Sequence, residues 1–302
     1  MPVDQQFQQI VDLYSQIPGL GELPLDELRS ASKPENPNPT PVDEITEQAI
    51  VGPGGELSVR IYRSGTPGKR PLLLFMHGGG FVLGDLKSHD EFARGLTAGA
   101  GAVTISVGYR LAPENPYPAA VDDCYAALLW AAENAADLGA DAGKLIVIGD
   151  SAGGNLAAVT ALRAREENGP SIAGQVLIYP TTDLSAPMQP APDGEFYILS
   201  PETRKFFNEA YLTDPVAQRQ LPTVSPLRAD SLAGLPPAFV ITAEYDPLCE
   251  QGEALAARFE ASGVATTLTR YEGAIHGFAT FPVPMAGTVM AQITEWLRSE
   301  YG

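Results

Sequence analysis

A serine at the centre of a glycine-rich motif is the residue best suited to covalent chemistry. Ser151 lies in GDSAG, directly after the apolar run 145–149 and directly before a helix expected over 152–167. In this setting a GxSxG motif places the serine on a tight, strained strand-to-helix turn, because the two glycines allow strand and helix to approach closely. The turn raises the hydroxyl above the sheet edge and aims the free N–H groups of the helix at a reacting oxygen. We therefore expect Ser151 to be a nucleophile.

A run of three glycines supplies a second element of the same chemistry. Gly78, Gly79 and Gly80 follow His77 and the apolar run 72–76. Glycines after a buried strand present backbone N–H groups with no side chains in the way, as an oxyanion hole requires. A phosphate-binding loop is the rival interpretation, but the sequence has no GxxxxGK(S/T) motif and no GxGxxG motif after a strand. The pattern therefore predicts an oxyanion hole.

The general base must be one of three histidines, because a serine hydroxyl needs a neighbouring imidazole to take its proton. His77 belongs to the glycine loop, and His89 looks like the solvent-side start of a helix. His276 lies in the loop GAIHGF, between a strand ending at Tyr271 and the last helix, where a loop can present a base. By elimination, we expect His276 to be the base.

A carboxylate must orient that histidine. The candidates are Asp150, Asp183, Glu244 and Asp246. Asp150 adjoins the serine and is expected to point elsewhere on the turn. Asp246 follows the apolar run 238–243, at the carboxyl edge where the sites of open α/β sheets gather. Because one class of triads runs Ser, Asp, His along the chain, we prefer Asp246 to Glu244; an N-cap of the following helix is its alternative role.

Short β-rich runs alternate with helix-length segments from residue 43 onward. We expect strands over 44–51, 57–63, 72–76, 102–108, 145–149, 174–179, 238–243 and 266–271. We expect helices over 89–100, 119–137, 152–167, 249–262 and 285–299. The turn GPGG between the first two strands favours an antiparallel hairpin, and the later continuous apolar runs favour a parallel sheet. The sequence predicts an α/β fold, with a mostly parallel eight-stranded sheet and helices on both faces.

Two segments fall outside this alternation. The first combines the proline-rich stretch PENPNPTP with an amphipathic helix. The apolar positions of that helix are Phe7, Ile10, Val11 and Tyr14. The second carries many prolines and two aromatic pairs, and an insertion of this size is more often functional than a plain surface excursion. We expect an N-terminal cap arm over 1–42, a cap insertion over 183–230, and one catalytic domain built from 43–182 and 231–302.

The composition limits the partners. Among 302 residues, 37 are acidic and 19 are basic, which gives a formal charge of −18 and counts against binding to nucleic acid or anionic membranes. The N-terminus does not resemble a signal peptide and no apolar run is long enough to span a bilayer, so we expect a soluble, cytoplasmic protein. Cys124 and Cys249 lie in apolar helix-like segments and are expected to be buried free thiols.

With these features in place, the sequence resembles the hormone-sensitive-lipase-like esterases, bacterial family IV of the lipolytic enzymes, in the α/β-hydrolase superfamily. The matching stretches are HGGGFVLGD, YRLAPENPYPAAVDD, IGDSAGGNLA, EYDPL and IHGF, and the resemblance extends from about residue 45 to the end. Asn115 stands where histidine is common in the family, and Tyr117 where phenylalanine is common. The acid loop reads DPLCEQG rather than DPLRDEG, but Asp246 is kept.

The resemblance implies an α/β-hydrolase fold with a helical cap, and a serine carboxylesterase with no metal or organic cofactor. The implied site comprises the triad Ser151, Asp246 and His276, the oxyanion hole Gly79, Gly80 and Ala152, and the supporting residues His77, Gly78 and Asp150. The cap aromatics suit an apolar acyl pocket of limited size, so we expect short- to medium-chain esters as substrates. The last strand, as a sheet edge, favours a homodimer, for which the family offers precedent.

Other functions remain open from the residues alone. One is a catalytically silent small-molecule binding module, such as the plant gibberellin receptor, which resembles the family but lacks the triad histidine. Another is an amidase, a carbamate hydrolase or a deacetylase that uses the same triad, and a third is a long-chain lipase. The presence of all three triad residues favours an enzyme.

Overall fold

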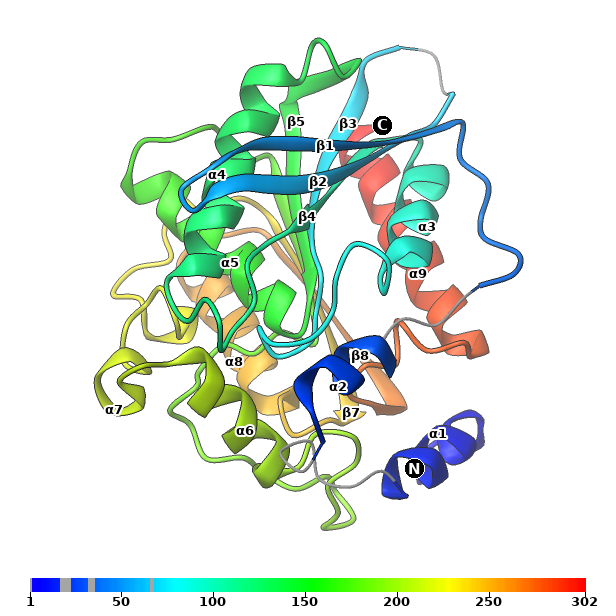
Figure 1. Ribbon diagram of the computed structural model, residues 1–302, viewed down its shortest axis with the longest axis vertical. Coiled ribbons are helices and arrows are strands. Elements are labelled where there is room, and N and C mark those ends of the chain that lie inside the picture. The colour runs from blue at the N-terminus through cyan, green and yellow to red at the C-terminus, as the bar shows by residue number, and fades with distance from the viewer. Residues whose placement is uncertain (1, 17–22, 32–35, 66–67) are drawn as a thin grey trace.

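One mixed β-sheet runs through the computed structural model, which describes residues 2–16, 23–31, 36–65 and 68–302 (Figure 1). Its strands lie in the order β1-β2-β4-β3-β5-β6-β7-β8. The strands are β1 (Glu44–Gly52), β2 (Gly55–Arg63), β3 (Arg70–Met76), β4 (Val103–Gly108), β5 (Ala140–Asp150), β6 (Gly174–Ile178), β7 (Ala238–Tyr245) and β8 (Thr266–Ile275). β2 pairs antiparallel with both β1 and β4, and all other neighbours are parallel. The predicted hairpin and the mostly parallel eight-stranded sheet are confirmed.

Helices cover both faces of this sheet, as predicted (Figure 1). On one face lie α3 (Asp90–Ala100) and α9 (Pro284–Tyr301), and on the other α4 (Ala119–Asn134), α5 (Ala152–Glu166) and α8 (Cys249–Ala261). Successive strand residues point to opposite faces of the sheet, so β3 contributes side chains to the apolar core on each face. Leu72 and Leu74 belong to one core, and Leu73 and Phe75 belong to the other. None of the described helices is both long enough and apolar enough to cross a membrane.

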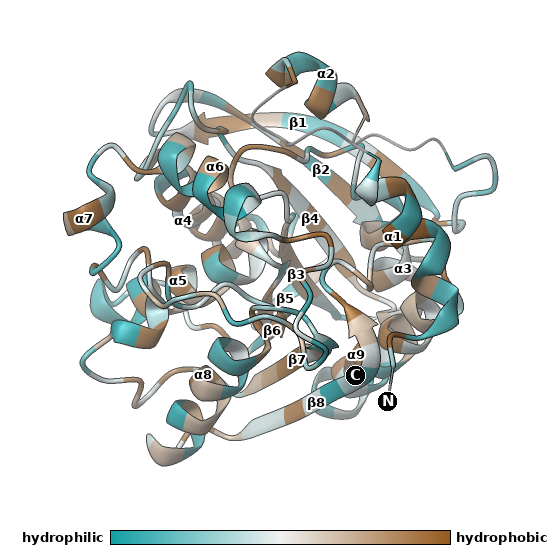
Figure 2. Cartoon of the chain, turned by 90° about the horizontal axis from the view of Figure 1, so that it is seen from below, coloured by the Kyte–Doolittle hydropathy of each residue, from teal (hydrophilic) through white to brown (hydrophobic). Residues whose placement is uncertain are grey.

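Shorter helices gather around the carboxyl ends of the parallel strands (Figures 1 and 2). From the N-terminal segment come η1 (Gln5–Phe7), α1 (Gln8–Ser15) and α2 (Leu25–Ala31), and from 183–230 come α6 (Pro201–Tyr211), α7 (Pro215–Gln218) and η3 (Pro226–Arg228). Helix α6 begins where the Ser200 side chain accepts the Thr203 N–H at 3.2 Å, with proline at the first helical position. The segment 183–230, which the structure describes throughout, contains no strand.

β8 is an edge of the sheet, because only β7 pairs with it. This outcome confirms the sequence-based expectation for the last strand. The side chain of Leu268 on this strand is 42% exposed, although leucine is usually buried. The homodimer predicted from this edge stays a prediction.

Candidate active site

Three loops at the carboxyl edge of the sheet bring the predicted triad residues together. Ser151 follows β5, Asp246 follows β7 and His276 follows β8. Ser151 Oγ lies 2.9 Å from His276 Nε2, and His276 Nδ1 lies 2.7 Å from Asp246 Oδ2. An ionised carboxylate only accepts hydrogen bonds, so the imidazole proton belongs on Nδ1 and Nε2 is free to accept from the serine hydroxyl. This arrangement can activate a serine for attack on a carbonyl carbon.

The turn that carries Ser151 is strained and tightly packed. Ser151 has φ 53° and ψ −115°, outside the helical and extended regions. A Cβ atom on Gly149 would lie 2.1 Å from the carbonyl oxygen of Gly153, and one on Gly153 would lie 2.0 Å from that of Met76. Only glycine fits at both positions, as the motif predicts. The Ser151 N–H donates to the Ile178 carbonyl at 2.9 Å, which ties the turn to β6.

The glycine loop lies beside this turn. The loop turns sharply, with φ 118° at Gly79 and 61° at Gly80. Within the part of the chain that the structure describes, the N–H groups of these two glycines make no hydrogen bond. The Gly78 N–H donates to Asp150 Oδ1 at 2.8 Å. Ala152, the third predicted oxyanion donor, is the first residue of α5.

The structure also places the other acidic candidates. Glu244 accepts the Gly273 N–H at 2.7 Å, so it serves the backbone of β8. Asp183 forms an ion pair of 3.1 Å with Arg228. The two carboxylate oxygens of Asp246 have different partners. Oδ1 accepts the Leu248 N–H at 2.8 Å, and Oδ2 faces His276. Asp246 is therefore a partner of the histidine, whereas its alternative role as N-cap of the following helix is wrong, because the N-cap of α8 is Leu248 and no side chain caps that helix.

His77 lies beneath the glycine loop. Its Nδ1 is 2.8 Å from the Gly78 carbonyl, and its own carbonyl accepts the Tyr109 hydroxyl at 2.7 Å. Its ring stacks on Tyr109 with 4.2 Å between centroids. Burial, aided by the neighbouring His89, lowers the pKa of His77 to about 4. His77 is thus a neutral structural group of the loop near neutral pH. Tyr109 belongs to the stretch YRLAPENPYPAAVDD, and the sequence alone predicted no role for this side chain.

His89 lies elsewhere than the sequence indicated. The predicted solvent-side position is wrong, because the His89 side chain is only 11% exposed and its Nε2 lies 3.4 Å from Asp150 Oδ1. The contact joins the start of α3 to the turn that carries Ser151. These segments are far apart in the chain, so no local pattern reveals the contact. The sequence offered one indication of this contact. Histidine is scarce, with only three in the chain, so a partner could have been sought for each of them.

The two cysteines differ in their surroundings. Cys124 is buried, as predicted, but Cys249 is half-buried, so the expectation for Cys249 is wrong. Cys249 is the first residue of α8, and its Sγ lies 3.5 Å from Glu253 Oε1 rather than in an apolar core. Burial and the Glu253 carboxylate raise the pKa of the Cys249 thiol to about 12, which disfavours the nucleophilic thiolate. Among the described residues, no three His, Cys, Asp or Glu side chains are arranged to hold a metal ion.

Comparisons with known proteins agree with the observed fold. A protein family described as "alpha/beta hydrolase fold" matches residues 73–280. The carboxylic ester hydrolase LipN of Mycobacterium tuberculosis is 44% identical over 249 residues, which cover 80% of this chain and 66% of LipN, slightly under two thirds of that relative. An arylesterase of Saccharolobus solfataricus is 38% identical, with 85% and 83% of the two chains covered. The hyperthermophilic esterase of Pyrobaculum calidifontis superposes with a TM-score of 0.91 at 38% identity, over 99% of both chains.

The fold and the similarity define the class as an α/β hydrolase. The chain belongs to this family and to its carboxylic ester hydrolases of the hormone-sensitive-lipase-like group, as the sequence motifs indicated.

The packing of the turn predicts that Gly153→Ala destabilises the protein and abolishes activity. The added methyl group would overlap the Met76 carbonyl and push α5 away from β3, which should lower the unfolding free energy by about 1–3 kcal/mol or more. Gly287→Ala is the matched control, because it also adds a Cβ near the start of a helix but into open space. Urea unfolding should show Gly287→Ala equal to the wild type or up to about 1 kcal/mol more stable. Equal stability of the two variants would contradict this packing.

The buried His77 predicts a specific acid dependence of stability. In the unfolded chain His77 takes up a proton near pH 6.5, whereas in the folded protein it does so only near pH 4. Stability from the neutral ring is therefore complete above pH 6.5 and is lost as pH falls toward about 4, by roughly 3 kcal/mol over that window. His77→Gln should reduce the slope of unfolding free energy against pH in this window, measured by urea unfolding. An unchanged slope would show that His77 is not the group responsible.

Proposed function

We propose that this protein is a serine carboxylesterase that hydrolyses short- to medium-chain carboxylic esters through a covalent acyl-enzyme. The observation that carries the proposal is the hydrogen-bonded line from Ser151 through His276 to Asp246, with distances of 2.9 and 2.7 Å. The names of the relatives support an ester as substrate, since they include a carboxylic ester hydrolase, a carboxylesterase and an arylesterase. The glycine loop beside the serine adds the donors that ester chemistry requires.

Acylation begins when Ser151 Oγ attacks the ester carbonyl carbon. His276 Nε2 takes the hydroxyl proton as the new C–O bond forms, and the imidazolium is stabilised by Asp246. The carbonyl oxygen becomes an oxyanion, to which the N–H groups of Gly79, Gly80 and Ala152 can donate; one such donor is typically worth about 3–4 kcal/mol of barrier. The tetrahedral intermediate then expels the alkoxide, which leaves as an alcohol with the proton from the imidazolium.

Deacylation follows the same path with water in place of the serine. His276 removes a proton from water as the water oxygen bonds to the acyl carbon, and the same oxyanion donors serve the second intermediate. The bond to Ser151 Oγ then breaks, the imidazolium returns its proton to the serine, and a carboxylic acid is released. Each group ends the cycle in its starting state, so the reaction consumes only ester and water.

The proposed acyl-length limit rests on the cap insertion. A Cβ atom on Gly80 would lie 2.4 Å from the ring of Phe207, so this ring from α6 packs directly over the oxyanion loop. The neighbouring Phe206 ring lies 5.5 Å from that of Phe207 between centroids. Aromatic rings this close to the oxyanion loop favour a short apolar acyl group and leave little room for a long one.

We also propose that residues 1–42 and 183–230 act as a cap over one catalytic domain, built from 43–182 and 231–302. Arg29 of α2 supports this division, because it donates to the carbonyl oxygens of Val82 and Ala112 at 2.9 and 3.0 Å. It also pairs with Glu114 at 2.6 Å. The N-terminal segment is thereby tied to the chain that follows the glycine loop.

Replacement of the nucleophile tests the proposed function. The wild type should hydrolyse p-nitrophenyl acetate and butyrate faster than the longer esters of a series up to the palmitate, measured by release of nitrophenol. Ser151→Ala should lower kcat on the order of 10⁴-fold or more, because the acyl-enzyme can no longer form. A folded wild type that is inert to every ester in the series would favour the binding module, and a Ser151→Ala variant with most of its activity would rule out Ser151 as the nucleophile.

Removal of the Phe207 ring tests the size limit. Phe207→Ala should move the preferred acyl chain toward longer esters, because it opens space next to Gly80. Lys205→Ala is the matched control on the same helix, since the Lys205 side chain is 73% exposed, and it should leave the chain-length profile unchanged. The ratio of kcat/KM for octanoate over butyrate measures the effect. An identical ratio in the two variants would exclude Phe207 from setting the acyl length.

A further inference from the structure

A histidine outside the proposed triad makes contact with the machinery of the reaction. His89 lies at the start of α3, and its ring is near those of Phe75 and His77, at centroid distances of 6.0 and 5.5 Å. Its Nε2 lies 3.4 Å from Asp150 Oδ1, and its Nδ1 lies 2.9 Å from Ser88 Oγ. The catalytic cycle described above uses no atom of His89.

The proton arrangement of this contact follows from its partners. The Asp150 carboxylate only accepts hydrogen bonds, so the ring nitrogen that faces it must carry a proton. Ser88 Oγ lies against the other ring nitrogen and also donates to the Asp85 carbonyl at 3.0 Å. His89 is thus set up as a hydrogen-bond donor toward Asp150.

Asp150 lies between this histidine and the oxyanion loop. It directly precedes Ser151 and is 96% buried, and its Oδ1 also accepts the Gly78 N–H at 2.8 Å. Burial alone would raise the pKa of Asp150, but the charge and hydrogen bond of His89, with the Gly78 N–H, lower it below its usual value. A Cβ atom on Gly78 would lie 2.3 Å from Asp150 Oδ2, so the carboxylate fits closely against the loop.

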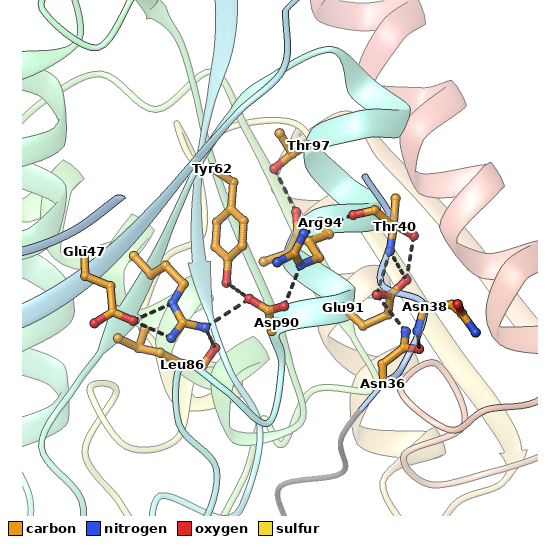
Figure 3. A network of polar contacts seen from close by, with 12 residues as sticks. Asn36, Asn38, Thr40, Glu47, Tyr62, Leu86, Asp90, Glu91, Arg94 and Thr97 are labelled. Atoms are coloured by element: carbon orange, nitrogen blue, oxygen red, sulfur yellow. Dashed lines mark hydrogen bonds and ion pairs between the residues drawn. The ribbon is translucent and has the colours of Figure 1, made fainter. Parts of the chain in front are cut away.

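The start of α3 is itself firmly held, as Figure 3 shows. Asp90, the residue after His89, accepts the Tyr62 hydroxyl at 2.7 Å and Arg94 Nε at 2.5 Å. Arg60 Nη1 donates to the same carboxylate at 3.0 Å, and Arg60 also pairs with Glu47 of β1. Because β2 and α3 are joined through Asp90, the backbone at His89 has a fixed position relative to the sheet.

We propose that His89 is a positioning residue: by donating to Asp150 it holds that carboxylate against the Gly78 N–H and so fixes the oxyanion loop relative to Ser151. The inference rests on the proposed esterase function and adds a residue to it. Without His89, the buried Asp150 carboxylate would lose its charged or polar donor and turn toward other partners. The loop would then shift, and a displacement near 1 Å at a reacting centre lowers the rate on the order of 100-fold.

A cavity gives experimental access to this contact. His89 lines a cavity of about 1040 Å³, together with Ser88, Asp90, Thr280 and Phe281. A free imidazole molecule is small enough to enter it and to replace the missing ring in a variant. Lys87 lines the same cavity but is exposed, and its backbone rather than its side chain bonds Asp85. Lys87→Ala is therefore the matched control.

The first experiment measures butyrate ester hydrolysis by His89→Ala, His89→Gln and Lys87→Ala with and without imidazole. His89→Ala should lower kcat roughly 10- to 100-fold with KM within about twofold, because substrate contacts are untouched. His89→Gln should retain more activity, since its amide N–H can replace the ring donor. Imidazole should restore part of the lost kcat in His89→Ala only. Affinity for an alkyl trifluoromethyl ketone, which forms an oxyanion adduct with the serine, should fall in parallel with kcat.

A double-mutant cycle with Asp150→Asn provides the second measurement. It tests the proposal independently of the activity of His89→Ala alone. If His89 acts through Asp150, the double variant His89→Ala/Asp150→Asn should be no slower than Asp150→Asn alone. Fully additive losses would overturn the proposal, as would a His89→Ala kcat within twofold of the wild type. An inactive wild type would instead refute the esterase function, and the proposed role of His89 with it. If the wild type is active, Ser151→Ala is inactive and the His89 variants are unaffected, only the proposed role of His89 is refuted.

Discussion

The close contact between the end of β3 and the turn after β5 is the constraint on which the site depends. Gly153 at the start of α5 lies against the carbonyl oxygens of Met76 and His77, at a separation that leaves no space for a Cβ atom. Two parallel strands alone would place their loops side by side, but not at a fixed offset. This contact, with the Asp150 carboxylate against the Gly78 N–H, sets the glycine loop relative to Ser151. Ser151 and the glycine loop, the proposed nucleophile and source of oxyanion donors, are thus parts of one packed unit.

Loops that follow the neighbouring strands contribute the other residues of the proposed site. β7 and β8 lie beyond β6 in the sheet, and their loops bring the carboxylate and the imidazole to the serine from one direction. Tyr179, which follows β6, lies with its ring 5.1 Å from that of His276. From the opposite direction, α3 brings His89 to Asp150. The short helices lie at the same edge of the sheet (Figure 2).

Much of this arrangement could be predicted from sequence because the decisive signals are local. Strands β3, β5, β6 and β7 contain apolar runs bounded by glycine or proline, and the GDSAG and HGGG motifs indicate close approaches and backbone shapes that only glycine permits. Helix α6 was not predicted, because the prolines around it hid its start, although Ser200 and Pro201 form a standard N-terminal cap. The positions of His89 and Cys249 depend on contacts with Asp150 and Glu253 in the folded chain. The periodicity of the sequence cannot predict the His89 contact, because it joins distant segments. The general preference of cysteine for burial gives the wrong prediction for Cys249.

The most direct test of the account is to locate the acyl group during turnover. The account predicts that a p-nitrophenyl butyrate reaction, stopped by acid within the first turnovers, yields protein with one butyryl group, which peptide mapping by mass spectrometry places on Ser151. His276→Ala should form this adduct far more slowly, because the serine then lacks its base. A butyryl group on another residue such as Cys249 would contradict the account. Release of nitrophenol by the wild type without any butyryl group on Ser151 would also contradict the account.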